Sequence, residues 1–247
     1  MKKISYDNVY VITPGKCGTQ TISFGINKYT NQNYKFKNYN KLNLSHSLLD
    51  LKNVLNTNNN LIITGIRNPV DRNLSSFFQF ILDNKIKYIQ MNTNEYKGIL
   101  MSINLTKKQI LKTTINKLIE IYFNKKELHT IFNDWFNEFL EITDITTFDK
   151  EKGYSVYHLK NDNKLIVYTL EKLNDNKQDL CELIGISEIC DENIGDNKWY
   201  KNLYKKMKQN ITYNKEYLDS LLDTKIMKMF YTDEDIQTMY KKYKQCD

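Results

Sequence analysis

The stretch Val9–Thr21 reads VYVITPGKCGTQT, and it decides the fold class of this chain. Its first four residues form a β-branched and aromatic run of the kind that fills a buried strand, and Pro14-Gly15 ends that run in a tight loop. A helix is expected to follow from Thr19 to about Lys28. Strand, loop and helix in direct succession are typical of parallel strands that are joined by crossing helices.

The same order recurs fifty residues later. Leu61–Ile66 reads LIITGI and predicts a second buried strand, and a helix is expected from about Val70 to Asn84. Residues 31–43, in between, are polar and aromatic without a clear period, and the Asn-rich patch Asn56–Asn60 is interpreted as a surface turn. Because ligands of open parallel sheets bind beyond the carboxyl ends of the strands, both loops are expected at one binding edge.

The rest of the chain predicts further helices and one strand pair. Apolar residues at helical spacing predict helices over 107–123 and 128–140, and residues 153–158 with 165–170 predict a hairpin or paired strands. The last third reads as mostly helical. No repeat and no Pro/Gly/Ser-rich linker divides the chain. We therefore expect a single domain over residues 1–247, with a three-layer α/β fold in which helices flank a central parallel sheet.

Composition indicates a folded chain outside the membrane. The 247 residues are 40% hydrophobic and 13% aromatic, with a mean hydropathy of -0.61. No run of about 18 apolar residues occurs, and the start lacks the features of a signal peptide, so we expect a cytoplasmic protein with no integral membrane segment. Four widely separated cysteines without a CxxC pair are expected to be free thiols: Cys17, Cys181, Cys190 and Cys246.

Rare residue types point to the candidate site. The chain has no alanine, only two arginines among 36 basic residues, and only two prolines. Both arginines (Arg67, Arg72) and both prolines (Pro14, Pro69) fall within residues 13–23 and 67–78. Arginine offers a planar fork of donors for a phosphate, which lysine cannot reproduce. The net charge of +7 also suits an anionic ligand, although a lysine-rich solvated surface explains it equally well.

The loop over residues 14–21 has the features of an anion site. Glycines at positions 15 and 18 let backbone N–H groups approach a ligand, and the helix that starts near Thr19 directs its positive end toward the same place. Lys16 adds a mobile charge. Because this lysine precedes the last glycine, the loop is not a Walker A sequence, which argues against an ordinary ATPase. The alternative is a plain strand-to-helix turn with Thr19 as its cap, and it leaves the lysine unexplained.

The second segment reads RNPVDRNLS over Arg67–Ser75. Together the two segments resemble the PAPS-dependent sulfotransferases, where PAPS is 3'-phosphoadenosine 5'-phosphosulfate. The loop is similar to their 5'-phosphosulfate loop, Pro-Lys-x-Gly-x-x-Ser/Thr, except that Gly15 is inserted between the proline and the lysine. The second segment matches their 3'-phosphate motif, Arg-x-Pro-x-x-Arg-x-x-Ser. The alternative for this segment is a surface helix that binds nothing.

This resemblance implies a P-loop-like fold, PAPS as co-substrate and no metal. Lys16 would contact the bridging oxygen of the donor, and Arg67 and Ser75 would bind its 3'-phosphate, while Arg72 would brace the helix or the edge of the ligand. The other donor-binding residues implied are Gly15, Cys17, Gly18, Thr19, Gln20 and Thr21.

A general base is needed to take the acceptor proton, and histidine suits neutral pH. His46 is the favoured candidate because it lies between the two motifs, where related carbohydrate sulfotransferases can carry a catalytic histidine. An ordinary polar histidine and an unassigned acid remain alternatives. His129, inside a predicted helix, is expected to be structural, and His158 is an outside candidate for the base.

Asn197–Lys201 reads NKWYK and matches the name-giving block of the NKWYK capsular polysaccharide synthesis family, which itself resembles sulfotransferases. Lys198 could reach a phosphate and Trp199 could stack on adenine or a sugar ring, or the aromatic pair could belong to the core. The expected function is transfer of a sulfuryl group from PAPS to a carbohydrate hydroxyl, with no nucleic-acid partner and with the oligomeric state left open. The alternatives are a kinase or NTPase, and a catalytically silent module that binds nucleotides or acidic polysaccharide.

Overall fold

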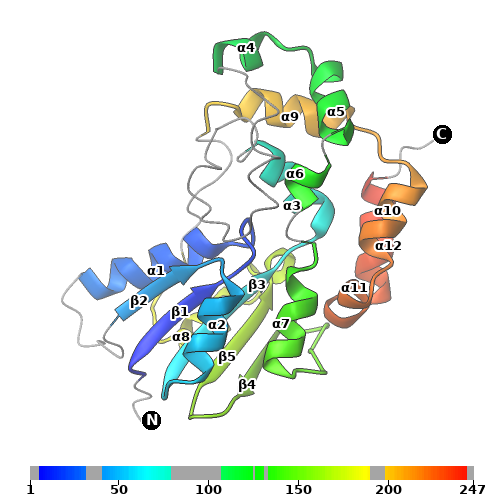
Figure 1. The fold of residues 1–247 in the computed structure, drawn as a ribbon. Helices are drawn as coiled ribbons and strands as arrows, with labels where there is room; N and C mark the ends of the chain where they lie inside the picture. The colour runs from blue at the N-terminus through cyan, green and yellow to red at the C-terminus, as the bar shows by residue number, and fades with distance from the viewer. Residues whose placement is uncertain are drawn as a thin grey trace.

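The chain folds around a five-stranded, mostly parallel sheet (Figure 1). The computed structural model describes residues 6–31, 41–78, 107–124, 126–130, 133–189 and 198–243. In sheet order the strands are β2 (Lys41–Ser45), β1 (Asn8–Ile12), β3 (Asn60–Ile66), β5 (Lys164–Thr169) and β4 (Tyr154–His158). The first four are parallel, and β4 is antiparallel to β5. The predicted parallel sheet and the predicted strand pair are both confirmed.

Helices cover both faces of this sheet. Side chains alternate across the strands, because successive residues of a strand point to opposite faces. One face packs against α1 (Thr19–Asn31) and α8 (Lys177–Ile184) through Val9, Val11, Leu61, Ile63, Ile166 and Tyr168. The other packs against α2 (Leu48–Leu55) and α7 (Trp135–Thr143) through Ile12, Ile62, Ile66, Leu165 and Val167. The α/β class expected from the sequence is therefore confirmed.

The remaining helices lie beyond the carboxyl ends of the strands or beside the sheet (Figure 1). They are α3 (Pro69–Ser76), α4 (Lys107–Lys112), α5 (Ile115–Asn124), α6 (Glu127–Thr130), α9 (Lys201–Asn210), α10 (Lys215–Leu222), α11 (Lys225–Phe230) and α12 (Asp233–Tyr243). A short 3-10 turn, Leu170–Lys172, follows β5. The last third is mostly helical, as expected.

Two predicted helices are wrong in extent, because each is divided. The helix expected over 107–123 breaks before α5, where the hydroxyl of Thr114 accepts a hydrogen bond from the N–H of Lys117 and so starts a new helix. The helix expected over 128–140 breaks between α6 and α7, where Asn133 contacts the side chain of Arg72. The helix expected up to Asn84 is described as far as Ser76, and its predicted residues beyond 78 lie outside the described residues.

The segments around β2 and β3 also differ from expectation. The polar stretch before residue 45 contains an edge strand, β2, and Ser47 then caps the unexpected helix α2 by accepting from the N–H of Leu49. Asn60 is a buried strand residue and not part of a surface turn. Its N–H donates to Oδ1 of Asn163 at 2.9 Å, so the start of β3 is fixed by the hairpin 103 residues later.

Two further expectations can be compared with the structure. Within the described ranges, no helix is both long enough and apolar enough to cross a membrane. Cys17 and Cys181 are free and buried, as expected, while Cys190 and Cys246 lie outside the described residues. The single domain stays a prediction.

Candidate functional site

The strand register brings the two sequence motifs to the same edge of the sheet. Val11 of β1 pairs with Ile63 of β3, and Ile66 of β3 pairs with Thr169 of β5. The segments that follow these parallel strands therefore emerge side by side at their carboxyl ends. This is the edge where ligands of open α/β sheets bind.

The backbone of the first loop has the geometry of an anion cradle. Gly15, Lys16 and Gly18 have φ angles of 86°, 60° and 82°. This left-handed region is costly for a residue with a Cβ such as Lys16, and backbone strain of this kind is over-represented at functional sites. A Cβ on Gly18 would lie 2.8 Å from the Cδ1 of Leu170. The N–H of Ile22 donates to the carbonyl of Gly18, which starts the hydrogen bonding of α1. The N–H groups in the first turn of a helix have no acceptor within the helix, so α1 directs them toward a ligand at the loop.

Buried contacts hold the loop in this shape. The hydroxyl of Tyr168 donates to the carbonyl of Cys17 at 2.8 Å, and the thiol of Cys17 lies 3.3 Å from the carbonyl of Gly15. The buried hydroxyl of Thr19 bonds with that of Thr13. This bond closes the loop onto the end of β1, and Thr19 is the first residue of α1. Burial raises the pKa of Cys17 to about 12, against the nearby arginine charges, which keeps the thiol protonated.

Arg67 joins the two motifs. Its Nη1 donates to the carbonyl of Lys16 at 3.1 Å and to the hydroxyl of Ser75 at 3.2 Å. All three residues are half-buried, so solvent still reaches them. Both bonds use Nη1, and within the described part of the chain no hydrogen bond engages Nε or Nη2 of this guanidinium. The other edge of the fork can therefore donate to an anionic ligand.

Arg72 is a brace, which was one of its two expected roles. Its side chain is 2% exposed. Its Nη2 donates to Oδ1 of Asn133. This contact ties α3 to the segment that precedes α7, away from solvent.

His46 lies one residue beyond β2 and contacts the loop directly. Its Nδ1 lies 2.7 Å from the carbonyl oxygen of Thr13. Because a carbonyl can only accept, Nδ1 carries the proton, and Nε2 of the neutral ring has the free lone pair that a base needs. The indole N–H of Trp135 donates to the carbonyl of His46 at 3.1 Å and fixes this residue from the α7 side. The imidazole is exposed at the binding edge.

The other two histidines do not share this position. The buried ring of His129 stacks on Tyr122 at 3.9 Å, and burial lowers its pKa to about 3, so it is a neutral core residue as expected. His158 pairs with Lys164 at the amino end of β5. It therefore lies at the opposite edge of the sheet from the loop, and the expectation that it could serve as the base is wrong.

Lys198 and Trp199 lie just before α9. Trp199 packs edge-on against Tyr200 with a centroid distance of 5.5 Å, and the buried Tyr200 contacts Phe78. This packing favours the alternative that Trp199 and Tyr200 belong to the hydrophobic core and do not stack on a ligand.

Glu171, which follows β5, is the most informative residue to which the sequence assigned no role. Its Oε1 accepts from the N–H of Asn68 at 2.9 Å, and its Oε2 accepts from the hydroxyl of Tyr231 at 2.7 Å. Desolvation raises the pKa of this carboxyl, against these hydrogen bonds, although part of the side chain remains exposed. Asn68 in turn caps α3 by accepting from the N–H of Val70. Glu171 therefore fixes the turn that carries Arg67.

The arrangement as a whole can bind an anion with two charged ends and accept a proton beside it. Lys16, the N-terminus of α1 and the fork of Arg67 supply positive charge, and His46 supplies a free imidazole nitrogen. Among the described residues, no group of three or more His, Cys, Asp and Glu side chains could hold a metal ion. No protein-family model, no curated protein and no solved structure matches this chain.

Proposed function

We propose that this protein is a P-loop-like sulfotransferase that moves a sulfuryl group from PAPS to a carbohydrate hydroxyl of a capsular or surface polysaccharide. One observation carries the proposal: Nη1 of Arg67 bonds both to the carbonyl of Lys16 and to the hydroxyl of Ser75. The segments that resemble a 5'-phosphosulfate loop and a 3'-phosphate motif therefore meet at a single side chain. A donor with a phosphate at each end of its ribose suits such a pair of neighbouring sites.

Each end of the donor has a matching set of groups. The 3'-phosphate would take the free edge of the Arg67 fork together with the hydroxyl of Ser75. The phosphosulfate would lie against the loop N–H groups and the ammonium of Lys16. ADP and ATP lack the 3'-phosphate, so they would leave the remaining donors of Arg67 without an anionic partner.

The chemistry follows from the same positions. The acceptor oxygen attacks sulfur in line, an S–O bond to the acceptor forms, and the S–O bond to the 5'-phosphate breaks, releasing 3',5'-ADP. Nε2 of His46 takes the acceptor proton, because its Nδ1–H is held by Thr13. Lys16 and the N-terminus of α1 stabilise the negative charge that develops on the leaving phosphate, where preorganised donors are most effective.

Calorimetry with 3',5'-ADP, ADP and ATP tests this proposal. We expect 3',5'-ADP to bind most tightly, and Ser75→Ala to reduce that preference on the order of tenfold by removing one hydrogen bond to a charged group. Ser76→Ala is the control, since Ser76 is on the same helix and its buried hydroxyl makes no hydrogen bond within the described residues. Equal or absent binding of 3',5'-ADP would overturn the proposal.

Turnover of labelled PAPS then separates an enzyme from a silent binding module. Tighter binding of ATP with Mg²⁺ would instead favour a kinase or NTPase.

A further inference from the structure

The positive charge of the described chain is concentrated in one region. Residues 107–124 and 198–210 contain nine lysines and a single acidic residue, Glu120. All other described residues together contain 18 basic and 22 acidic side chains. A lysine-rich composition alone does not explain this difference, because lysines elsewhere are matched by acids.

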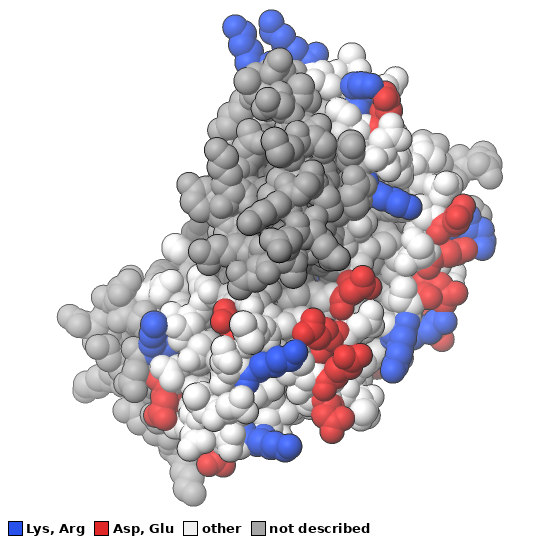
Figure 2. Space-filling view, in the orientation of Figure 1, with Lys and Arg blue, Asp and Glu red and all other residues white. Residues whose placement is uncertain are grey.

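The two segments form one structural unit. They fold into α4, α5 and α9, and α5 packs against α9. Figure 1 shows the three helices together beyond the carboxyl edge of the sheet, and Figure 2 shows mainly blue side chains at this end of the molecule, while red and blue side chains are mixed lower on the same face. We name this unit, residues 107–124 and 198–210, the basic lobe.

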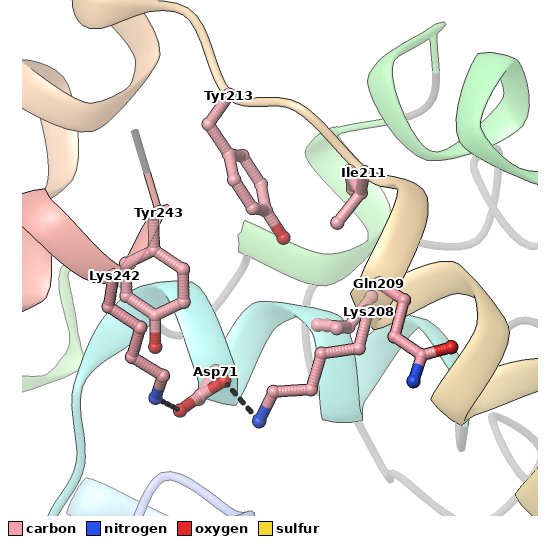
Figure 3. A pocket seen from close by; sticks show the side chains of 8 residues that line it. Asp71, Lys208, Gln209, Ile211, Tyr213, Lys242 and Tyr243 are labelled. Atoms are coloured by element: carbon pink, nitrogen blue, oxygen red, sulfur yellow. Dashed lines mark hydrogen bonds and ion pairs between the residues drawn. The ribbon is translucent and has the colours of Figure 1, made fainter. Parts of the chain in front are cut away.

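Within the basic lobe, one row of lysines extends along α9 toward the candidate site. Lys201, Lys205 and Lys208 occupy positions i, i+4 and i+7 of α9, which places them on one side of the helix over about 10 Å. The ammonium of Lys208 lies 3.2 Å from Oδ1 of Asp71 on α3 (Figure 3). Ser75 lies one turn further along α3. The basic lobe is thus connected to the helix that carries part of the proposed donor site.

We propose that the basic lobe binds an acidic polysaccharide, so that the carbohydrate acceptor is a polymer with regularly spaced anionic groups. This inference rests on the proposed function and names its substrate class. Flexible ammonium groups on an exposed helix suit spaced point charges better than they suit one buried ligand. In the described part of the lobe, the only large apolar side chain that is exposed is Leu111, which gives an anionic membrane little to bury.

The test compares two charge-matched variants of the full chain. The lobe variant replaces four exposed lysines with glutamine: Lys108, Lys112, Lys205 and Lys206. The control variant makes the same change at four exposed lysines elsewhere: Lys41, Lys160, Lys225 and Lys241. Binding is measured with oligogalacturonate and with neutral dextran of equal length, each at low and high salt. Calorimetry with 3',5'-ADP is run on all three proteins.

We expect the wild type to bind oligogalacturonate in a salt-dependent way and to ignore dextran. The lobe variant is expected to bind on the order of tenfold more weakly, since each exposed charge contributes a fraction of a kcal/mol, while the control variant stays close to wild type. Equal loss in both variants, equal binding of dextran, or tighter binding to phosphatidylserine vesicles or DNA would each overturn the inference. If 3',5'-ADP binds to none of the three proteins, the proposed donor site is overturned. The comparison of the two variants would still show whether the basic lobe binds the acidic polysaccharide.

Discussion

Asp71 is held as a carboxylate by two lysines from helices far away in the sequence. It lies in the first turn of α3, with Lys242 of α12 2.7 Å from its Oδ2 and Lys208 of α9 3.2 Å from its Oδ1 (Figure 3). Its side chain is 12% exposed and borders a cavity of about 130 Å³ that is also lined by Tyr213 and Tyr243. The substitution Asp71→Asn would remove the charge and keep the shape of the side chain.

The size of the effect follows from the pKa. Burial alone would raise the pKa of Asp71, but the ammonium groups of Lys208 and Lys242 outweigh burial and lower it from 3.8 to about 2. That difference corresponds to about 2 kcal/mol of folding free energy at neutral pH. Because the folded pKa lies below the unfolded one, this contribution is present above pH of about 4 and is lost as the pH falls toward 2.

Urea unfolding of the wild type and of Asp71→Asn at pH 7 and at pH near 2.5 measures this contribution. We expect the variant to be less stable by about 2 kcal/mol at pH 7 and the gap to shrink at the lower pH. Asp223→Asn is the control, because Asp223 is 60% exposed in its ion pair with Lys228, and exposed pairs contribute little. A gap for Asp71 that does not change with pH would refute the reasoning, since the loss would then not come from the charge.

Three further predictions concern the loop and the base. Gly65→Ala would place a Cβ 2.3 Å from the carbonyl oxygen of Cys17 and 2.6 Å from the ring of Tyr168, so we expect a lower melting temperature together with loss of 3',5'-ADP binding. Tyr168→Phe leaves the buried carbonyl of Cys17 without its donor and is expected to cost about 1 to 3 kcal/mol in urea unfolding; an unchanged midpoint would contradict this role. His46→Asn keeps a donor for the Thr13 carbonyl but removes the base, so labelled-PAPS turnover is expected to fall roughly 10²- to 10⁴-fold while calorimetry finds 3',5'-ADP binding unchanged. Full turnover by this variant would exclude His46 as the base.

Local sequence predicted the parts of the fold that local forces determine. The strands before Pro14 and Arg67 are mostly apolar, and each is followed within three residues by a proline, whose backbone has few allowed conformations. Each strand and the start of the helix after it could therefore be placed to within a few residues. The edge strand β2 was missed because an edge strand needs neither a continuous apolar run nor full burial, and KLNLS has neither.

The contacts that shape the candidate site could not be read from the sequence, because they join distant segments. Tyr168 reaches Cys17 across 151 positions, and Glu171 reaches Asn68 across 103. Tyrosine is one of the commoner residues here, with 18 in the chain, so no single tyrosine stands out in the way that the two arginines do. Only the register of β3 with β5 places Tyr168 beneath the loop and Glu171 beside the turn.

The structure also gives a physical reason for the two arginines in a chain that otherwise uses lysine. Arg67 donates its Nη1 hydrogens to acceptors from both motifs and keeps Nε–H with a neighbouring Nη2 hydrogen as a second donor edge. A lysine ammonium that made the same two bonds would retain one hydrogen. Arg72 is buried against the amide oxygen of Asn133, where a delocalised and weakly hydrated charge costs less to desolvate than a compact ammonium. Lysine therefore fails at each position for a different reason: at Arg67 it cannot offer a second donor edge to a ligand, and at Arg72 it cannot be buried at the same cost.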